Sequence, residues 1–374
     1  MEQKLTIQRV TDAKLRREFI MFPFRLYRGD PCWVAPLIGD EKKFLLARSN
    51  PFLKDNPIEL FLCRHGNETV GRIAAVLNRD HQRQHHDRCG FFGMFECVND
   101  VQAADMLMQA AASWLRENGC DTLRGPTSFS VNGIAGLLLD GFKAPPVVLM
   151  AYNPPYYREL IEGLGFHQAM RFFAYEVSRE TIRFPRAIGR LEERLRDNGI
   201  RIRIFDLRQA ERDMAILIDL FNKAWADNWG FIPTTLAEGL EDLKKMRPVI
   251  RPDLIFFAEK EGRPVGFSLS VPDINQALRP LGGRLFPFGW LQLLGSLKKI
   301  DAIRVTLMGV LKEYRQLGID LAFYRMTAEN AYRHGIYKAE MSWILESNEA
   351  MNRVLRHINA QVTKTYALYE KPIA

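Results

Sequence analysis

The chain has 374 residues, 47% of them hydrophobic and 26% charged, and its 52 basic and 44 acidic residues give a formal net charge of +8. This composition is that of an ordinary globular protein, so it excludes a disordered chain, a collagen-like chain and a small disulfide scaffold. At roughly 150 residues per domain, the length favours two domains.

The cellular setting expected from the sequence is the cytoplasm. The five cysteines are odd in number, lie in the first third of the chain and show no CxxC spacing, which favours reduced thiols. We expect no signal peptide, because the opening MEQKLTIQRV has no apolar core. We also expect no membrane segment and no membrane partner, because the apolar stretches 133–150 and 286–297 are interrupted or too short.

The first half of the chain contains the elements of one α+β unit. A β-hairpin, a strand, a helix, a long insertion, a second helix and a strand are expected in this order at 58–76, 90–96, 105–118, 127–150, 153–166 and 170–177. The hairpin turns at Gly66-Asn67, the first helix ends before Gly119, and Asn153 is expected to cap the second helix.

The second half repeats this order after a charged helix at 187–198. Its hairpin, insertion, strand, two helices and last strand are expected at 254–271, 275–298, 302–308, 320–334, 348–360 and 363–369. The dipeptide Val70-Gly71 recurs as Val265-Gly266, and Asn153 recurs as Asn348, both at a shift of 195 residues. Matched elements in one order predict two copies of one α+β unit, at 1–185 and 200–374.

One loop of the second half carries chemistry. The sequence from Val310 to Asp320, VLKEYRQLGID, follows the strand at 302–308 and begins the helix. It resembles motif A of the GNAT (GCN5-related N-acetyltransferase) superfamily, V-x-x-x-x-R/Q-x-x-G-x-G/A, with Arg315 and Gly318 in place. Backbone amides at a helix N-terminus, a glycine that allows close approach and an arginine together suit the pyrophosphate of coenzyme A.

The resemblance covers nearly the whole chain and implies two tandem GNAT-like units, each a mixed, mostly antiparallel sheet flanked by helices. It implies acetyl-CoA or another acyl-CoA as co-substrate. The residues expected to hold it are Met308, Val310, Arg315, Gln316, Leu317, Gly318, Ile319, Asp320 and Asn348.

The second half departs from the family pattern at three places: Asp320 in motif A, Leu355 in motif B, and Asn359-Ala360 where Gly-Phe usually closes the motif B helix. Asp320 replaces the last Gly/Ala of motif A, so either the loop rearranges and coenzyme A binds, or the carboxylate caps the helix and closes the site. In the motif B helix Asn348 matches, but Leu355 replaces the tyrosine that often serves as general acid. Tyr366 and Tyr369, beyond that helix, are either substitute proton donors or half-buried aromatics of a strand.

The first half shows the opposite pattern. Its motif B, 153–166, is well kept and ends in Gly165-Phe166, whereas CVNDVQAAD stands where the motif A loop belongs. We therefore expect no pyrophosphate site there and interpret this unit as a scaffold or substrate half. Glu96 ends its strand at the place where some family members carry a general-base glutamate.

Two further stretches have open interpretations. The insertion 127–150 and the residues after it offer Asn132, Asp140, Tyr152 and Tyr156 for a polar substrate, such as an amine held by Asp140; the alternative is a loop packed for its own stability. The apolar stretch 286–297 would cover an acyl chain, contact another subunit or pack in the core, and core packing is favoured.

No metal site is predicted. His81 and His85 stand at i and i+4 and would suit a metal on a helix, but the surrounding charges of 79–88 favour a solvated loop. Walker A, GxGxxG, HExxH and GxSxG motifs are absent from the sequence, which argues against nucleotide hydrolases, Rossmann oxidoreductases, zincins and serine hydrolases.

The resemblance implies an acyl-CoA-dependent N-acyltransferase, with acetyl-CoA the first donor to consider, acting on a small-molecule or peptide amine. Two alternatives remain open. One is a non-catalytic tandem GNAT fold that binds a small molecule or a partner, and the other is a transferase that uses aminoacyl-tRNA as donor. Nucleic acid is not the expected main partner, because no helix-turn-helix, zinc-finger or RNP-like pattern is found. An oligomer is compatible with the sequence.

Overall fold

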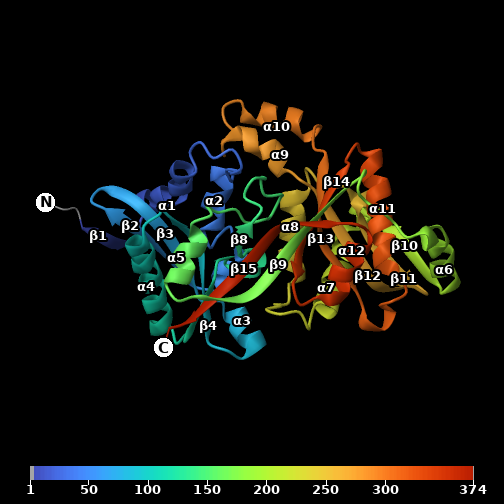
Figure 1. The fold of residues 1–374 in the computed structure, drawn as a ribbon, viewed down its shortest axis with the longest axis horizontal. Coiled ribbons are helices and arrows are strands. Elements are labelled where there is room, and N and C mark those ends of the chain that lie inside the picture. The colour runs from blue at the N-terminus through green and yellow to red at the C-terminus, as the bar shows by residue number, and fades with distance from the viewer. Residues whose placement is uncertain (1–3, 374) are drawn as a thin grey trace. The chain divides into compact units, whose positions relative to one another are not determined.

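The computed structural model describes residues 4–373, which divide into two units (Figure 1). The described residues up to Arg171, together with Leu278–Leu293 and the chain from Lys364 on, form unit 1. Phe172–Ala277 and Leu294–Thr363 form unit 2. The segment from Lys364 on, which the sequence analysis places in the C-terminal copy, thus groups with unit 1.

Unit 1 is built on a sheet of order β1-β2-β3-β4-β5-β15, in which the β4–β5 pair alone is parallel. Its elements in chain order are β1 (Leu5–Arg9), α1 (Ala13–Leu26), α2 (Ile38–Phe44), β2 (Ile58–His65), β3 (Glu68–Val76), α3 (Arg79–His85), β4 (Cys89–Cys97), α4 (Val101–Glu117), β5 (Thr122–Gly125), β6 (Thr127–Ser128), β7 (Ser130–Ala135), β8 (Leu137–Asp140), α5 (Tyr157–Gly163) and, from the other end of the chain, β15 (Gln361–Pro372).

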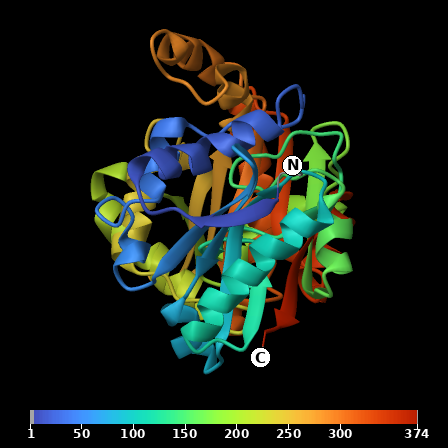
Figure 2. The same cartoon turned by 90° about the vertical axis from the view of Figure 1, so that its left-hand side faces the viewer.

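Alternation along the strands gives this sheet two covered faces. Phe61 and Ile73 point to the face that packs against α4, where Leu107 is fully buried. Leu62, the next residue along β2, points to the opposite face and shares a core with Phe19 of α1. Both helices therefore lie on the sheet through their apolar faces, one on each side, and Figure 2 shows them from the side of unit 1.

Unit 2 repeats the plan with the order β9-β14-β13-β12-β11-β10, in which β13–β14 is the parallel pair. Its elements are β9 (His167–Ser178), α6 (Leu191–Asp197), β10 (Ile200–Ile204), α7 (Ala210–Ala224), α8 (Leu236–Met246), β11 (Ile255–Lys260), β12 (Arg263–Pro272), α9 (Asn275–Leu278), β13 (Ala302–Val310), α11 (Ile319–Arg333), β14 (Lys338–Leu345) and α12 (Glu349–His357). The helix α10 (Gly289–Leu297) is divided: its residues up to Leu293 belong to unit 1 and the rest to unit 2.

The same two-faced packing recurs in unit 2. Phe256 stacks on Phe323 of α11 on one face, with ring centroids 6.3 Å apart. The next residue, Phe257, is buried on the other face with Leu217 of α7. The α+β class and the repeat of one sheet plan, both expected from the sequence, are therefore confirmed.

Each unit completes its sheet with a strand from the other half of the sequence. In unit 1, β15 pairs with β5, from Tyr369 opposite Gly125 to Pro372 opposite Thr122. In unit 2, the part of β9 from Phe172 on pairs with β14. The two copies have thus exchanged their closing strands.

The parallel strand pair of each unit separates partway along its length. In unit 1, β4 and β5 pair only over residues 89–91 of β4, so the end of β4 leaves the ladder. In unit 2, β13 and β14 pair over residues 302–305 of β13. Beyond these residues the two parallel strands of each unit no longer pair with each other.

Three local expectations were wrong. Asn153 does not cap a helix: its Oδ1 accepts from the N–H of Leu138 at 2.7 Å, and α5 begins only at Tyr157, after two prolines that remove the donors a cap would serve. Residues 79–85 form a helix rather than a solvated loop, because Asn78 caps it through the N–H of His81. The stretch 286–297 is not core, since α10 has no buried residue.

In the part of the chain that the structure describes, no helix is long and apolar enough to span a bilayer.

Candidate functional site

The end of β4 places one carboxylate among hydroxyls and a guanidinium. The hydroxyls of Tyr27 and Tyr157 both donate to Oε2 of Glu96, at 2.7 and 2.8 Å. A guanidinium nitrogen of Arg72, on the neighbouring strand, lies 3.9 Å from the other carboxylate oxygen. Tyr157 in turn accepts a hydrogen bond from the N–H of Cys97 at 2.7 Å, which fixes the ring against the strand. We call Tyr27, Arg72, Glu96 and Tyr157 the Glu96 cluster.

Burial sets the electrostatics of the Glu96 cluster. The Glu96 side chain is 14% exposed. Its burial raises the pKa of the carboxyl, Arg72 and the two tyrosine hydroxyls act in the opposite direction, and the carboxyl of Glu41 adds to the rise. Burial also raises the pKa of Tyr27 and of Tyr157. A carboxylate with a raised pKa is suited to accept a proton from an ammonium group.

Two of the four predicted substrate residues adjoin this cluster. Tyr156 donates from its hydroxyl to the carbonyl of Cys97 at 2.8 Å. Tyr152 donates to Oδ2 of Asp30 at 2.8 Å, and its ring centroid lies 6.0 Å from that of Tyr27. Trp33 stacks on the Tyr27 ring with centroids 5.0 Å apart. The segment after the insertion therefore contributes aromatic side chains next to the carboxylate.

The other two predicted substrate residues have different surroundings on unit 1. Asn132 is exposed on β7, and its N–H donates to the Ser130 hydroxyl at 3.2 Å. Asp140 is exposed at the end of β8 and accepts from the N–H of Gly141 at 2.8 Å. Both residues are in solvent, whereas the carboxylate of the Glu96 cluster is largely buried.

The N-terminus of α4, the helix that follows β4, is capped by the side chain of Asp100. Asp100 is the N-cap of α4, and its Oδ1 accepts from the N–H groups of Gln102 at 2.8 Å and Ala103 at 3.1 Å. Two amides that would otherwise face an anion are thus satisfied by a carboxylate, which also carries the wrong charge for a phosphate.

The corresponding helix of unit 2 begins differently. Gly318 is the N-cap of α11, and no side chain caps this terminus. Its φ of 87° lies in the left-handed region, which favours glycine, and a Cβ built there would lie 2.7 Å from Cδ1 of Leu191, so that side chain would have to shift. Amides at the start of an uncapped helix of this length form an anion-binding terminus.

Two charged side chains flank this terminus. Arg315 is exposed, and its guanidinium donates to the carbonyls of Val310 at 3.1 Å and Ala224 at 3.2 Å, which holds it across the loop. Asp320 lies in the first turn of α11, two residues past the cap position, and is half-buried. In the range 4–373, no backbone amide donates to the Asp320 carboxylate, so the self-capping geometry is not adopted.

The remaining predicted cofactor residues contribute backbone or packing. The carbonyl of Met308 accepts from the indole N–H of Trp225 at 2.9 Å, and Ile319 is buried in the core of unit 2. Leu317 packs on the same core, and Gln316 has a positive φ of 71° in the loop. Asn348 caps α12, as expected from the sequence, by accepting from the N–H of Met351 at 3.1 Å.

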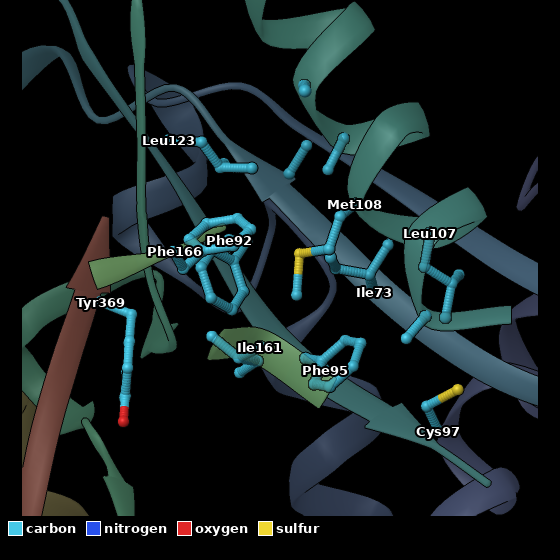
Figure 3. Close-up of a cluster of buried hydrophobic side chains, with 14 of the residues drawn as sticks. Ile73, Phe92, Phe95, Cys97, Leu107, Met108, Leu123, Ile161, Phe166 and Tyr369 are labelled. Atoms are coloured by element: carbon cyan, nitrogen blue, oxygen red, sulfur yellow. The ribbon is translucent and has the colours of Figure 1, made fainter. Parts of the chain in front are cut away.

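The two tyrosines predicted as proton donors belong to unit 1. Tyr366 and Tyr369 are both fully buried on β15, whereas the loop from Arg315 to Asp320 belongs to unit 2. Figure 3 shows Tyr369 at the edge of an apolar cluster, with its hydroxyl pointing away from the other side chains. That hydroxyl donates to Glu162 at 2.8 Å, and burial is the main cause of its raised pKa. A core position and an existing hydrogen bond account for Tyr369 without a catalytic role.

Strand register aligns the two units and shows how they differ. In unit 1, Arg72 pairs with Glu96; in unit 2, the residue after the shared glycine, Phe267, pairs with Gly309. The position of the carboxylate is therefore occupied by a glycine in unit 2. Conversely, unit 1 caps its helix with a carboxylate where unit 2 has Gly318. Unit 1 therefore has the carboxylate and a capped helix, whereas unit 2 has the helix without a side-chain cap and a glycine at the position of the carboxylate.

Sequence reasoning missed three members of the Glu96 cluster. Arg72 directly follows the repeated Val-Gly dipeptide, and Tyr157 stands in motif B, so both had a positional signal. Tyr27 comes from the end of α1, far away in sequence, and no local pattern marks it.

A separate group, His81, Asp87 and Cys89, has potential ligand atoms within 4.8 Å of one another. Burial lowers the pKa of His81 to about 4.

Comparison with known proteins assigns the chain to a family. The chain is 36% identical over 370 residues to "Bacterial ceramide synthase" of Caulobacter vibrioides, covering 97% of this chain and 96% of that protein. It is 35% identical over 363 residues to "Protein YghO" of Escherichia coli, covering 96% and 93%. The chain belongs to the family of these two proteins. No family model matches the sequence.

Solved structures extend this family assignment to the fold. A tandem GNAT protein from the clavulanic acid biosynthesis pathway superposes with a TM-score of 0.59 at 10% identity, covering 99% of both chains. The GNAT resemblance stated from the Arg315–Gly318 loop is therefore confirmed, and this chain has the tandem GNAT fold. This is an acyltransferase-like fold.

Proposed function

We propose that the chain is an acyl-CoA-dependent N-acyltransferase whose acceptor is the amino group of a long-chain amino alcohol. The observation that carries the proposal is the N-terminus of α11, which no side chain caps and which Gly318 and Arg315 adjoin; within unit 1, the largely buried Glu96 is a candidate base. The acceptor class comes from the relative named a bacterial ceramide synthase, because a ceramide is the amide of a fatty acid with such an amine.

Unit 2 binds the acyl-CoA in this proposal. The first amides of α11 receive the pyrophosphate, Gly318 permits close approach of the backbone, and Arg315 supplies a positive charge. The Asp320 carboxylate opposes the phosphates and reduces this affinity. The part of β13 that no longer pairs with β14 receives the acyl-pantetheine part.

Unit 1 binds the acceptor and supplies the base. Glu96 takes a proton from the ammonium of the acceptor, which frees the nitrogen lone pair. The nitrogen then attacks the thioester carbonyl and the C–N bond forms; the attacking nitrogen loses its second proton to solvent, the C–S bond breaks, and the thiolate leaves as the thiol after protonation from solvent. The aromatic side chains of Trp33 and Tyr152 beside the cluster suit an amphiphilic acceptor.

The test is amide formation by the purified full chain. Sphinganine is incubated with acetyl-CoA or palmitoyl-CoA, and the N-acyl product is measured by mass spectrometry. Glu96→Gln is expected to lower turnover at least about 100-fold while leaving the Kd for coenzyme A unchanged. Glu68→Gln, at an exposed glutamate of the unit 1 hairpin, is the matched control and is expected to retain full turnover.

Two results would overturn the proposal. One is that neither donor yields an amide and coenzyme A neither releases heat on titration nor raises the Tm, which would favour the non-catalytic alternative. The other is that Glu96→Gln turns over as fast as the unsubstituted chain, which would remove Glu96 as the base.

A further inference from the structure

The helix α10 and the residues before it form an apolar surface with little cover. No residue of α10 is buried. Phe286 and Phe288, just before the helix, have the largest exposed fractions among the exposed large hydrophobic residues, 81% and 73%, and within the helix Leu294, Leu291 and Trp290 are 56%, 52% and 45% exposed. Figures 1 and 2 show α9 and α10 lying outside the sheets. Side chains of this size are seldom left in water together without a binding partner.

The charged residues within the stretch 274–300 have a single sign. No aspartate or glutamate occurs from residue 274 to residue 300. The same stretch contains Arg279 and Arg284 before the helix and Lys298 and Lys299 after it, and all four are exposed. An apolar helix with two aromatic residues at its start and cations at both ends is the pattern of a segment that lies in a membrane interface.

We propose that the segment 286–299 docks the protein on an anionic membrane surface. Phe286, Phe288 and Trp290 enter the boundary between headgroups and acyl chains, where aromatic rings are favourable. The lysines and arginines remain at the level of the lipid phosphates. The helix has nine residues, about 14 Å in length, so it lies on the membrane rather than crossing its roughly 30 Å core.

Charge distinguishes this occupant from a second copy of the chain. A two-fold symmetric interface through α10 would bring its four cations close to the same four cations of the partner, without an acidic residue in the segment to offset them. Anionic headgroups neutralise these charges instead. The sequence analysis expects no membrane partner, and the exposure of Phe286 and Phe288 is the observation that changes this expectation.

The experiment is co-sedimentation of the full chain with lipid vesicles. Vesicles of phosphatidylcholine alone are compared with vesicles in which part of it is replaced by phosphatidylglycerol. The chain is expected to sediment with the anionic vesicles, and Phe286→Ser/Phe288→Ser to weaken binding at least about tenfold. The matched control Val101→Ser/Val362→Ser, which removes two exposed valines elsewhere, is expected to bind like the unsubstituted chain.

A second pair of variants tests the charges. Lys298→Glu/Lys299→Glu is expected to abolish the preference for phosphatidylglycerol, whereas Lys244→Glu/Lys245→Glu, an exposed lysine pair on α8, is expected to retain it. The Tm of each variant verifies folding. Trp290→Phe is expected to remove the fluorescence quenching caused by brominated lipids, because the remaining tryptophans stay outside the membrane.

Three results would refute the docking surface. The first is absence of sedimentation with anionic vesicles at low ionic strength. The second is equal binding by Phe286→Ser/Phe288→Ser. The third is a dimer that these substitutions dissociate while vesicles are not bound, which would assign the surface to a second copy. Vesicle binding is measured without substrates, so it can be detected even if the chain does not catalyse the proposed acyl transfer. Likewise, acyl transfer can be detected even if the chain does not bind vesicles.

Discussion

Removing one hydroxyl from the Glu96 cluster should change the pH dependence in a defined direction. Tyr27→Phe deletes the 2.7 Å hydrogen bond to Glu96 and keeps the ring that stacks on Trp33. A hydrogen bond to a charged group contributes about 1.5–3 kcal/mol, and one pKa unit corresponds to about 1.4 kcal/mol. The pKa of Glu96, already raised by burial, should therefore rise by a further one to two units, approximately.

The activity assay is the acidic limb of the kcat/KM profile. Turnover requires ionised Glu96, so the limb should move to higher pH in Tyr27→Phe by about one to two units. Tyr337→Phe, at an exposed tyrosine, should leave the limb in place. A limb that stays fixed or moves to lower pH in Tyr27→Phe would refute the assignment of Glu96 as the base that this hydroxyl stabilises.

The pH dependence of the free energy of unfolding tests the predicted rise in the pKa of Glu96 without substrate. Because the pKa of Glu96 is higher in the folded than in the unfolded chain, folding binds a proton, and the free energy of unfolding falls as pH rises from the unfolded value of about 4.3 to the folded value. In Tyr27→Phe the fall should extend to higher pH and be larger by about 1.4 kcal/mol for each added unit. Urea unfolding measured across pH tests this. The same dependence of the free energy of unfolding on pH in Tyr27→Phe and in the unsubstituted chain would contradict this prediction.

Three further predictions concern the helix termini. Asp320→Gly should tighten binding of coenzyme A about three- to tenfold, because it removes one like charge beside the phosphates, and calorimetric titration measures this; a change from undetectable to measurable binding would mean that Asp320 had closed the site. Asp100→Ala should lower the free energy of unfolding by about 1 kcal/mol through loss of the α4 cap, without creating coenzyme A binding in unit 1. Gly318→Ala should cost about 1–2 kcal/mol or more, because of the positive φ and the contact with Leu191; an unchanged urea midpoint would count against both.

The repeat and the loop were predictable because they are local in sequence. The Val-Gly dipeptides, the spacing of Arg315 and Gly318 and the cap at Asn348 each depend on a few neighbouring residues, and the structure places the loop and the cap where the pattern indicates. The superposition on a tandem GNAT structure confirms the fold that these patterns implied.

The exchange of closing strands and the Glu96 cluster were not predictable in the same way. Pairing of β15 with β5 joins residues far apart in sequence, from Tyr369 opposite Gly125 to Pro372 opposite Thr122. Tyr27 reaches Glu96 only through the packing of α1 on the sheet. The stretch 286–297 was assigned to the core because hydrophobicity alone does not distinguish a buried segment from an exposed one.

The exchanged strands also determine when each unit can form during synthesis. A ribosome releases the helices of unit 1 and strands β1 to β5 first, but the partner of β5 lies in the segment from Lys364 on, which emerges only after all of unit 2. The edge of β5 therefore stays open while the chain from Pro126 to Thr363 is made. A chain cut between its two sequence halves would retain this open edge in one fragment.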